Sequence, residues 1–379
     1  RSLKRPLHIH TKGEGFLGCL GQGDFFPREN LEPVKSLKGI DVRQVSSGWS
    51  HSAAVTRDGH LLVWGRPYDF KGSLRLSNLN RFAPIMVRAV NAFADSREVM
   101  TEPTIMPIIG QEVSTEGGPS MRVDVKVASV GCSSALTAVL TDAGHVYCMG
   151  QNRWGQCGVG SENPKHILSP TRSGGVLLKD EKPILLRKES LVTELIRQRG
   201  LSDDSLFVDA YARAMRSMAF ACLLQVVRMA LGFQHVLVLS ESGKVFGWGK
   251  GERGQLGSTE TDVRTAVRVP LPSKAVSVSC GFNHSVAVLE SGEVYVWGKM
   301  QNPEVRDSSG PVPVYHDQHE PRRVKVASPE ISAGDISDVV ITEAVCGSYT
   351  TVLRSECGRL FIFGIMSDTR HILHTPREV

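Results

Sequence analysis

Residues 279–298 read SCGFNHSVAVLESGEVYVWG, and this stretch decides the fold. Two alternating apolar runs flank the dipeptide Ser291-Gly292, and glycine supplies the positive φ that a tight hairpin turn needs. The stretch therefore predicts a β-hairpin that ends at the aromatic-glycine pair Trp297-Gly298. A single two-stranded hairpin is only marginally stable in water, so this unit must pack against others.

The same layout recurs along the chain: a first glycine, a strand, an X-Gly turn, a second strand and a closing glycine. The five copies begin at Gly48, Gly131, Gly232, Gly281 and Gly347. In four copies the closing glycine lies 17 positions after the first glycine; in the second copy it lies 19 positions after it, with Ala143 interpreted as an extra turn residue. Hairpins that recur at a fixed spacing predict a repeat architecture with a shared core.

Some copies continue into a glycine-rich loop, at residues 150–158 and 249–257. Residues 13–21 match the same nine positions, so the chain starts inside a repeat. Its missing hairpin is expected to come from the C-terminal segment. A ring closed in this way leaves no sheet edge exposed.

The G-x-x-H start, the X-Gly turn, the W-G end and the G-Q-L-G loop resemble the regulator of chromosome condensation repeat. The resemblance covers residues 7–65, 125–175, 225–300 and 339–379. Members of that family form β-propellers, usually with seven blades. The resemblance therefore implies an all-β propeller of six to seven four-stranded blades, of which six are visible, in a single domain spanning residues 1–379.

Three insertions interrupt the repeats. Residues 66–125 are interpreted as a loop or a decayed blade, and residues 299–338 as an exposed loop rich in proline and charge. Residues 176–224 contain apolar side chains at helical spacing, and Ser202 precedes two aspartates as a helix N-cap. This segment predicts a helical hairpin, either packed on the propeller wall or available to a partner.

The composition sets broad limits. A net charge of +5 permits contact with nucleic acid or an acidic protein without requiring it. None of the eight cysteines forms a C-x-x-C pair, which predicts a reducing compartment and no zinc site. No apolar run approaches the roughly 18 residues of a membrane-spanning helix. The basic start without Met fits either a removed targeting peptide or a truncated start, and favours a mitochondrial location over a nuclear or cytoplasmic one.

Two sequence patterns, one of glycines and one of histidines, resemble a cofactor site and a metal site. The glycines at 13–18 and 249–254 satisfy the dinucleotide fingerprint, but no helix is expected after them, so they are interpreted as repeat loops. His51, His235 and His284 occupy the same slot of separate copies and are expected to hydrogen-bond a neighbouring loop rather than a metal. No catalytic motif is recognised, and no cofactor is expected.

These observations predict a non-enzymatic scaffold subunit that binds other proteins of a larger assembly. The family resemblance extends this to a mitochondrial ribosomal or other RNA-containing assembly. It also implies an alternative, a guanine nucleotide exchange factor for a small GTPase. Both are inferences from family analogy rather than from site chemistry.

Two groups of residues are candidate contacts. The candidate partner contacts are Tyr211, Arg213, Arg216, Trp49, Phe233 and Phe282. The candidate RNA-phosphate contacts are Arg187, Lys188, Arg322, Arg323 and Lys325. Trp49 occupies a slot that tryptophans fill in the family's ultraviolet-B photoreceptors. Its counterparts here are interpreted as Cys132, Phe233, Phe282 and Ser348, which argues against photoreception.

Overall fold

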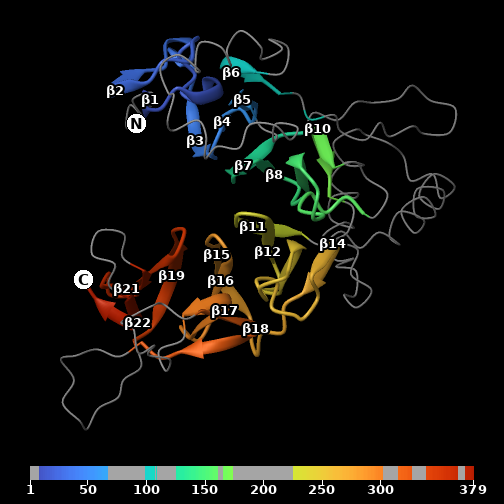
Figure 1. The fold of residues 1–379 in the computed structure, drawn as a ribbon, viewed down its shortest axis with the longest axis vertical. Helices are drawn as coiled ribbons and strands as arrows, with labels where there is room; N and C mark the ends of the chain where they lie inside the picture. Colours follow the sequence, from blue (N-terminus) through green and yellow to red (C-terminus); the bar gives the residue numbers. More distant parts are fainter. Residues whose placement is uncertain are drawn as a thin grey trace, which may run out of the picture. The chain divides into compact units, whose positions relative to one another are not determined.

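The computed structural model describes residues 8–66, 99–106, 108, 125–160, 165–173, 225–301, 315–326, 339–365 and 372–379. They form five four-stranded antiparallel sheets and one two-stranded sheet. Each sheet consists of strands consecutive in the chain, so the sheets follow one another in the colour order of Figure 1. The predicted all-β fold with six visible blades is confirmed for these residues. The helical hairpin predicted at 176–224 lies outside them.

The first sheet contains β3 (Val42–Ser47), β4 (His51–Thr56), β5 (Leu61–Gly65) and β6 (Met100–Ile105). The second contains β7 (Val127–Cys132), β8 (Leu136–Thr141), β9 (Val146–Gln151) and β10 (His166–Arg172). The third contains β11 (Val226–Leu231), β12 (His235–Ser240), β13 (Val245–Lys250) and β14 (Asp262–Arg268). The fourth contains β15 (Ala275–Cys280), β16 (His284–Leu289), β17 (Val294–Gln301) and β18 (Tyr315–Val324). The fifth contains β19 (Ile341–Cys346), β20 (Thr350–Ser355), β21 (Leu360–Ile365) and β22 (Ile372–Glu378).

The N-terminal half-blade is separate from these sheets. It contains β1 (His10–Gly13), the 3-10 turns η1 (Phe16–Gly18) and η2 (Lys35–Leu37), and β2 (Arg28–Pro33). β1 pairs with β2, whereas β22 completes the fifth sheet. The expectation that the C-terminal segment supplies the missing hairpin was therefore wrong for the residues described. The half-blade packs instead on the first sheet, through η1 against β5 and β6.

The core lies between the faces of successive sheets. All six residues of β4, β8, β12 and β16 are buried, because these second strands are covered on both faces. One apolar cluster joins the first and second sheets, another the third and fourth, and another the fourth and fifth. The first strands also contact one another from sheet to sheet.

The second copy starts two residues later than the sequence suggested. Ser133 donates its backbone N–H to the carbonyl of Leu136, the bond that Gly48 makes to His51. Counted from Ser133, the second copy has the same 17-residue length as the others. The interpretation of Ala143 as an extra turn residue was therefore wrong.

Four of the five fourth strands share a bulge that contains proline, and in β14 the equivalent residue is Ala266. In β18, Gln318 pairs with Gly298 and Arg322 pairs with Val296, so three residues ending at Pro321 lie opposite one. A bulged edge residue donates no ladder hydrogen bond, so proline is tolerated there. The equivalent prolines are Pro103 in β6, Pro170 in β10 and Pro376 in β22. β6 and β18 lie within the stretches interpreted as insertions, 66–125 and 299–338, and complete their sheets.

A tryptophan on the third strand binds the glycine-rich loop of the preceding repeat in three blades. The three indole N–H groups donate to backbone carbonyls at 2.9–3.0 Å: Trp64 to Cys19, Trp248 to Gln156 and Trp297 to Gln255. The other two blades carry Met149 and Phe363 in this slot, and these blades follow the stretches 66–125 and 299–338. The tryptophan is therefore found in the three blades that follow a glycine-rich loop.

We expect Trp248→Phe to lower the free energy of unfolding by about 1–2 kcal/mol, because the buried carbonyl of Gln156 loses its donor. The control is Trp154→Phe, because the Trp154 ring packs under Lys250 and its indole N–H has no partner among the described residues. Urea unfolding followed by circular dichroism measures both. Equal losses in the two variants would contradict a role for this bond.

Candidate functional site

The three repeat histidines tie consecutive blades together. Each Nε2 hydrogen-bonds a hydroxyl on the second strand of the next sheet at 2.9–3.1 Å: His51 with Thr137, His235 with Ser285, and His284 with Thr351. The predicted hydrogen bond to a neighbouring repeat is confirmed, although its partner lies on a strand rather than on a loop. The three imidazoles therefore bond separately and do not converge, and the described residues contain no cluster suited to a metal ion.

Burial holds these histidines in the neutral form. Burial lowers the pKa of His51 to about 4 and that of His284 to about 4. Burial, reinforced by the nearby His284, lowers the pKa of His235 to about 3. The rings therefore carry no charge near neutral pH.

The junction between the second and third sheets replaces this pair with apolar residues. Leu136 occupies the histidine slot of the second sheet, and Val236 occupies the hydroxyl slot of the third. Both side chains are buried. Because both polar partners are exchanged together, neither is left buried without a hydrogen bond.

Aromatic rings project from the loops that precede these histidines. The ring centroids of Trp49 and Phe233 lie 5.5 Å apart, those of Phe233 and Phe282 lie 4.0 Å apart and stacked, and those of Phe282 and Tyr349 lie 5.6 Å apart. These four residues are called the aromatic row below. Three of them are the predicted partner contacts outside the helical segment, and the structure brings them together. Their role in binding stays a prediction.

Tyr349 was missed because it lies one position beyond the slot that Trp49 defines, where the fifth copy has Ser348. The signal available was the aromatic residue itself, in a short loop that otherwise holds only small polar residues. The slot of the second sheet is held by Ser134 rather than by Cys132, since that copy starts at Ser133.

The row is held in place by hydrogen bonds between loops. Phe233 donates its backbone N–H to Phe282 at 3.3 Å, and Phe282 donates to Ser348 at 2.9 Å. The hydroxyl of Ser134 donates to the carbonyl of Phe233 at 3.1 Å. Even so, the rings are accessible: Trp49 is 63% exposed and Tyr349 is 44% exposed, while the two phenylalanines are half-buried.

The loops that carry the row are free of charged residues. Residues 46–51, 131–136, 231–236, 280–285 and 346–351 contain no Asp, Glu, Lys or Arg, although 22% of the chain is charged. Their histidines are neutral, as shown above. The row is therefore an apolar surface bordered by hydroxyl and carboxamide groups, which suits contact with an uncharged partner.

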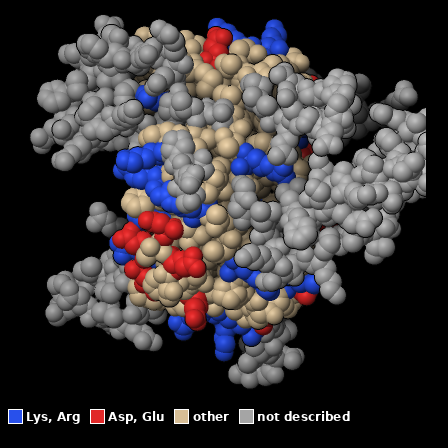
Figure 2. Space-filling view, turned by 90° about the vertical axis from the view of Figure 1, so that its right-hand side faces the viewer, with Lys and Arg blue, Asp and Glu red and all other residues tan. Residues whose placement is uncertain are grey.

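The candidate RNA contacts lie elsewhere. Arg322 and Arg323 are exposed on β18 and Lys325 follows it. Arg323 forms an ion pair with Glu293 at 3.1 Å, and Asp317 of the same strand pairs with Arg253 at 3.1 Å. On the face shown in Figure 2, acidic groups lie beside basic ones among the described residues.

The remaining candidates, Arg187, Lys188, Tyr211, Arg213 and Arg216, lie outside the described residues. No helix within the part of the chain that the structure describes is long and apolar enough to cross a membrane.

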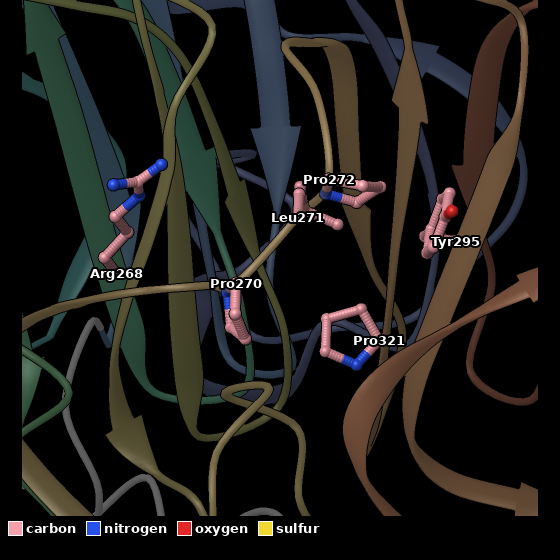
Figure 3. A pocket seen from close by; sticks show the side chains of 6 residues that line it. All are labelled: Arg268, Pro270, Leu271, Pro272, Tyr295 and Pro321. Carbon is pink, nitrogen blue, oxygen red and sulfur yellow. The ribbon is translucent and has the colours of Figure 1, made fainter.

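A shallow groove of about 500 Å³ lies where the third and fourth sheets adjoin. It is lined by Arg268, Pro270, Leu271, Pro272, Tyr295 and Pro321. Figure 3 shows Pro321 below Leu271 and Pro272, with Tyr295 and Arg268 on opposite sides. One guanidinium and one phenol among prolines and a leucine suit apolar contact rather than acid–base chemistry.

The environment of several cysteines makes their thiols less acidic. Burial raises the pKa of Cys132 and of Cys148 to about 12, and that of Cys346 to about 11. The seven described cysteines are all free thiols. At these buried or half-buried positions the thiolate, which is the reactive form, is disfavoured near neutral pH.

Four-stranded sheets that pack face to face in chain order, joined by inter-blade hydrogen bonds at equivalent positions, define a β-propeller built from hairpin repeats. The model of the regulator of chromosome condensation (RCC1) repeat matches residues 8–55 and 242–288, and a second RCC1-repeat model matches residues 42–70, 226–255 and 275–302. These matches span residues 8–70 and 226–302 and identify RCC1 repeats in this chain.

Similar proteins share the repeat within chains of other lengths. The chain is 25% identical to the ultraviolet-B receptor UVR8 of Arabidopsis thaliana over 67% of this chain and 63% of that protein. It is 26% identical to the human E3 ubiquitin-protein ligase HERC2 over 69% of this chain but 5% of that protein. It also resembles a chain in the structure of Kap60 bound to yeast RCC1 (Prp20), with a TM-score of 0.50 and 14% identity over 99% of this chain and 84% of that one. This last likeness concerns the fold alone.

Proposed function

We propose that the chain is a protein-interaction module, a scaffold subunit of a larger complex, whose partner docks on the aromatic row. The observation that carries this proposal is the exposure of four ring side chains on loops that are tied together by hydrogen bonds. Trp and Tyr are enriched among residues that contribute most to binding at protein interfaces. A contiguous exposed apolar patch of this kind marks an interaction site.

The fold does not require aromatic residues in this slot. Ser134 and Ser348 occupy it in the second and fifth sheets, whose hairpins pair in the same way as the others. A serine at position 49 would expose less apolar surface than Trp49 does, and the blade would still form. An exposed ring that the fold does not need is best explained by a partner that covers it.

We expect the triple variant Trp49→Ser, Phe233→Ser and Phe282→Ser to fold normally and to dissociate from its complex. The change copies serines already present at this slot, so its effect falls on binding. The measurement is gel filtration of native extract followed by co-purification and mass spectrometry, with wild type eluting in a large complex and the variant eluting free.

Phe26→Ser is the matched control, because Phe26 is an aromatic residue 56% exposed that lies outside the row. The control should remain in the complex. A triple variant that stays fully assembled, or a wild-type chain that elutes only as a free monomer, would refute the proposal.

The compartment of the assembly and its content of RNA are the subject of a separate proposal. We propose a mitochondrial complex that contains RNA. In such a complex the exposed side chains of Arg322 and Lys325 would contact the RNA phosphates. Cell fractionation tests the compartment. Retention of RNA on the purified complex that falls with added salt, and falls further in Arg322→Ala with Lys325→Ala, tests the contact.

Exchange of guanine nucleotide on a small GTPase is the alternative that the RCC1-repeat family favours. It predicts faster release of labelled GDP from a GTPase when the chain is added. Release at the uncatalysed rate for each GTPase that co-purifies with the chain would eliminate it and leave the scaffold proposal in place.

A further inference from the structure

Carboxamide groups accompany the rings of the aromatic row. Gln234 and Asn283 directly follow Phe233 and Phe282, and both are half-buried. Neither carboxamide hydrogen-bonds a described residue. The same holds for the indole N–H of Trp49 and the hydroxyl of Tyr349. The row therefore combines apolar ring surface with four groups that can donate a hydrogen bond.

An extended peptide has the complementary chemistry. A polyproline II helix leaves its backbone carbonyls without internal hydrogen bonds, and it rises about 3.1 Å per residue. The ring spacings of 5.5, 4.0 and 5.6 Å then correspond to roughly five residues of such a peptide. Proline rings pack on aromatic side chains, which is how proline-rich segments dock in aromatic-lined grooves.

The absence of charged residues from the five loops favours an uncharged ligand over a nucleic acid or a charged peptide. A nucleic acid strand needs cations beside its phosphates, and these loops contain none. Of the cations that bond the loops through their backbone, Arg66 is buried and Lys250 is paired with Glu252 at 2.9 Å. A charged peptide would lose its hydration against the row without gaining an ion pair. An uncharged segment loses the least hydration on binding.

We propose that the aromatic row binds an uncharged, proline-containing peptide segment in the polyproline II conformation, with its carbonyls bonded by Gln234 and Asn283. This inference rests on the proposed function and names the chemistry of the partner. The rings bind the proline and apolar side chains, and the carboxamides fix the direction and register of the segment.

Selection of a display library of random twelve-residue peptides against the full-length chain tests this inference. We expect the selected peptides to lack charge and to contain at least two prolines. One selected peptide, synthesised with blocked ends, is then titrated. Trp49→Ser should weaken its binding about thirtyfold, as truncation of a central aromatic residue does at an interface. Asn283→Leu should weaken it less, and Phe26→Ser should leave it unchanged.

Other outcomes overturn the inference. Selected peptides that are charged or lack proline, peptides whose binding ignores Trp49→Ser, or a selection that enriches nothing would each do so. Row-dependent binding of a twelve-residue oligothymidine would show a nucleic acid occupant. Row-dependent dimerisation in analytical ultracentrifugation would show a second copy of the chain.

The native complex separates the two proposals. If the triple serine variant leaves its complex while the selected peptides are charged, the peptide chemistry is wrong and the scaffold function stands. If the triple variant stays assembled, the proposed function itself fails.

Discussion

Gly232→Ala is expected to lower the free energy of unfolding by about 3 kcal/mol or more, at the upper end of what overpacking costs. A Cβ atom at this position would overlap the imidazole of His235. The ring cannot move aside, because it is fully buried and its Nε2 is bonded to Ser285 at 2.9 Å. Thermal and urea unfolding of the purified chain measure the loss.

Gly347→Ala is the matched control for this substitution. Gly347 begins the fifth copy, where Thr350 replaces the histidine, and a Cβ there would meet Thr350 only at 3.8 and 3.9 Å. We expect its stability to stay within about 0.5 kcal/mol of the wild type, as for surface substitutions in general. A similar loss in both variants would show that the two glycines serve the backbone rather than the histidine.

Acidification is expected to destabilise the propeller steeply below pH 6.5. The three inter-blade histidines titrate at about 4, 3 and 4 in the folded chain, against an ordinary value of 6.5. Below pH 6.5 these histidines bind protons in the unfolded chain but remain neutral in the folded chain. Their contribution to stability is therefore fully present above pH 6.5 and falls as the pH drops towards 4. Each histidine contributes a slope of up to about 1.4 kcal/mol per pH unit in that window. Urea unfolding at half-unit pH steps measures the slope.

The double variant His235→Leu with Ser285→Val should flatten this dependence by about one third. It copies the pair Leu136 and Val236, which the chain already uses between the second and third sheets. Its stability at pH 7 should change little, because both polar partners leave together. The carbonyl of Gln255, to which Ser285 also donates, keeps the indole N–H of Trp297 as a donor. An unchanged acid slope would show that other groups, such as paired carboxylates, govern the loss of stability.

The hairpins of each blade could be predicted from the sequence because their signal is local. The turn glycine and the alternating apolar runs lie within one copy, and the structure confirms them even where the first glycine is lost, as at Ser133. The start of the second copy was placed wrongly because Gly131 is a glycine of the preceding strand. The hydrogen bond from Ser133 to Leu136 reveals the equivalence, and so does the pairing of Leu136 with Gly150.

The fourth strands were harder to predict, because proline usually indicates a loop. Pro103 and Pro321 lie in long stretches that break the repeat spacing, so the strands around them were interpreted as insertions. The structure shows that proline occupies a bulge on the edge strand, where the absent N–H removes no ladder bond. The aromatic row depends on contacts between copies, so its extension to Tyr349 required the arrangement in space.

The paired slots at the blade junctions restrict which repeats can follow one another. Each blade presents one member of a pair to the blade before it and another to the blade after it. A third blade moved to follow the first would set Val236 against His51, leaving a buried imidazole without its hydroxyl, although its own hairpin would be intact. Two positions per blade therefore limit which repeats can be neighbours. The first and fourth blades, which both carry serine and histidine there, meet the same requirement.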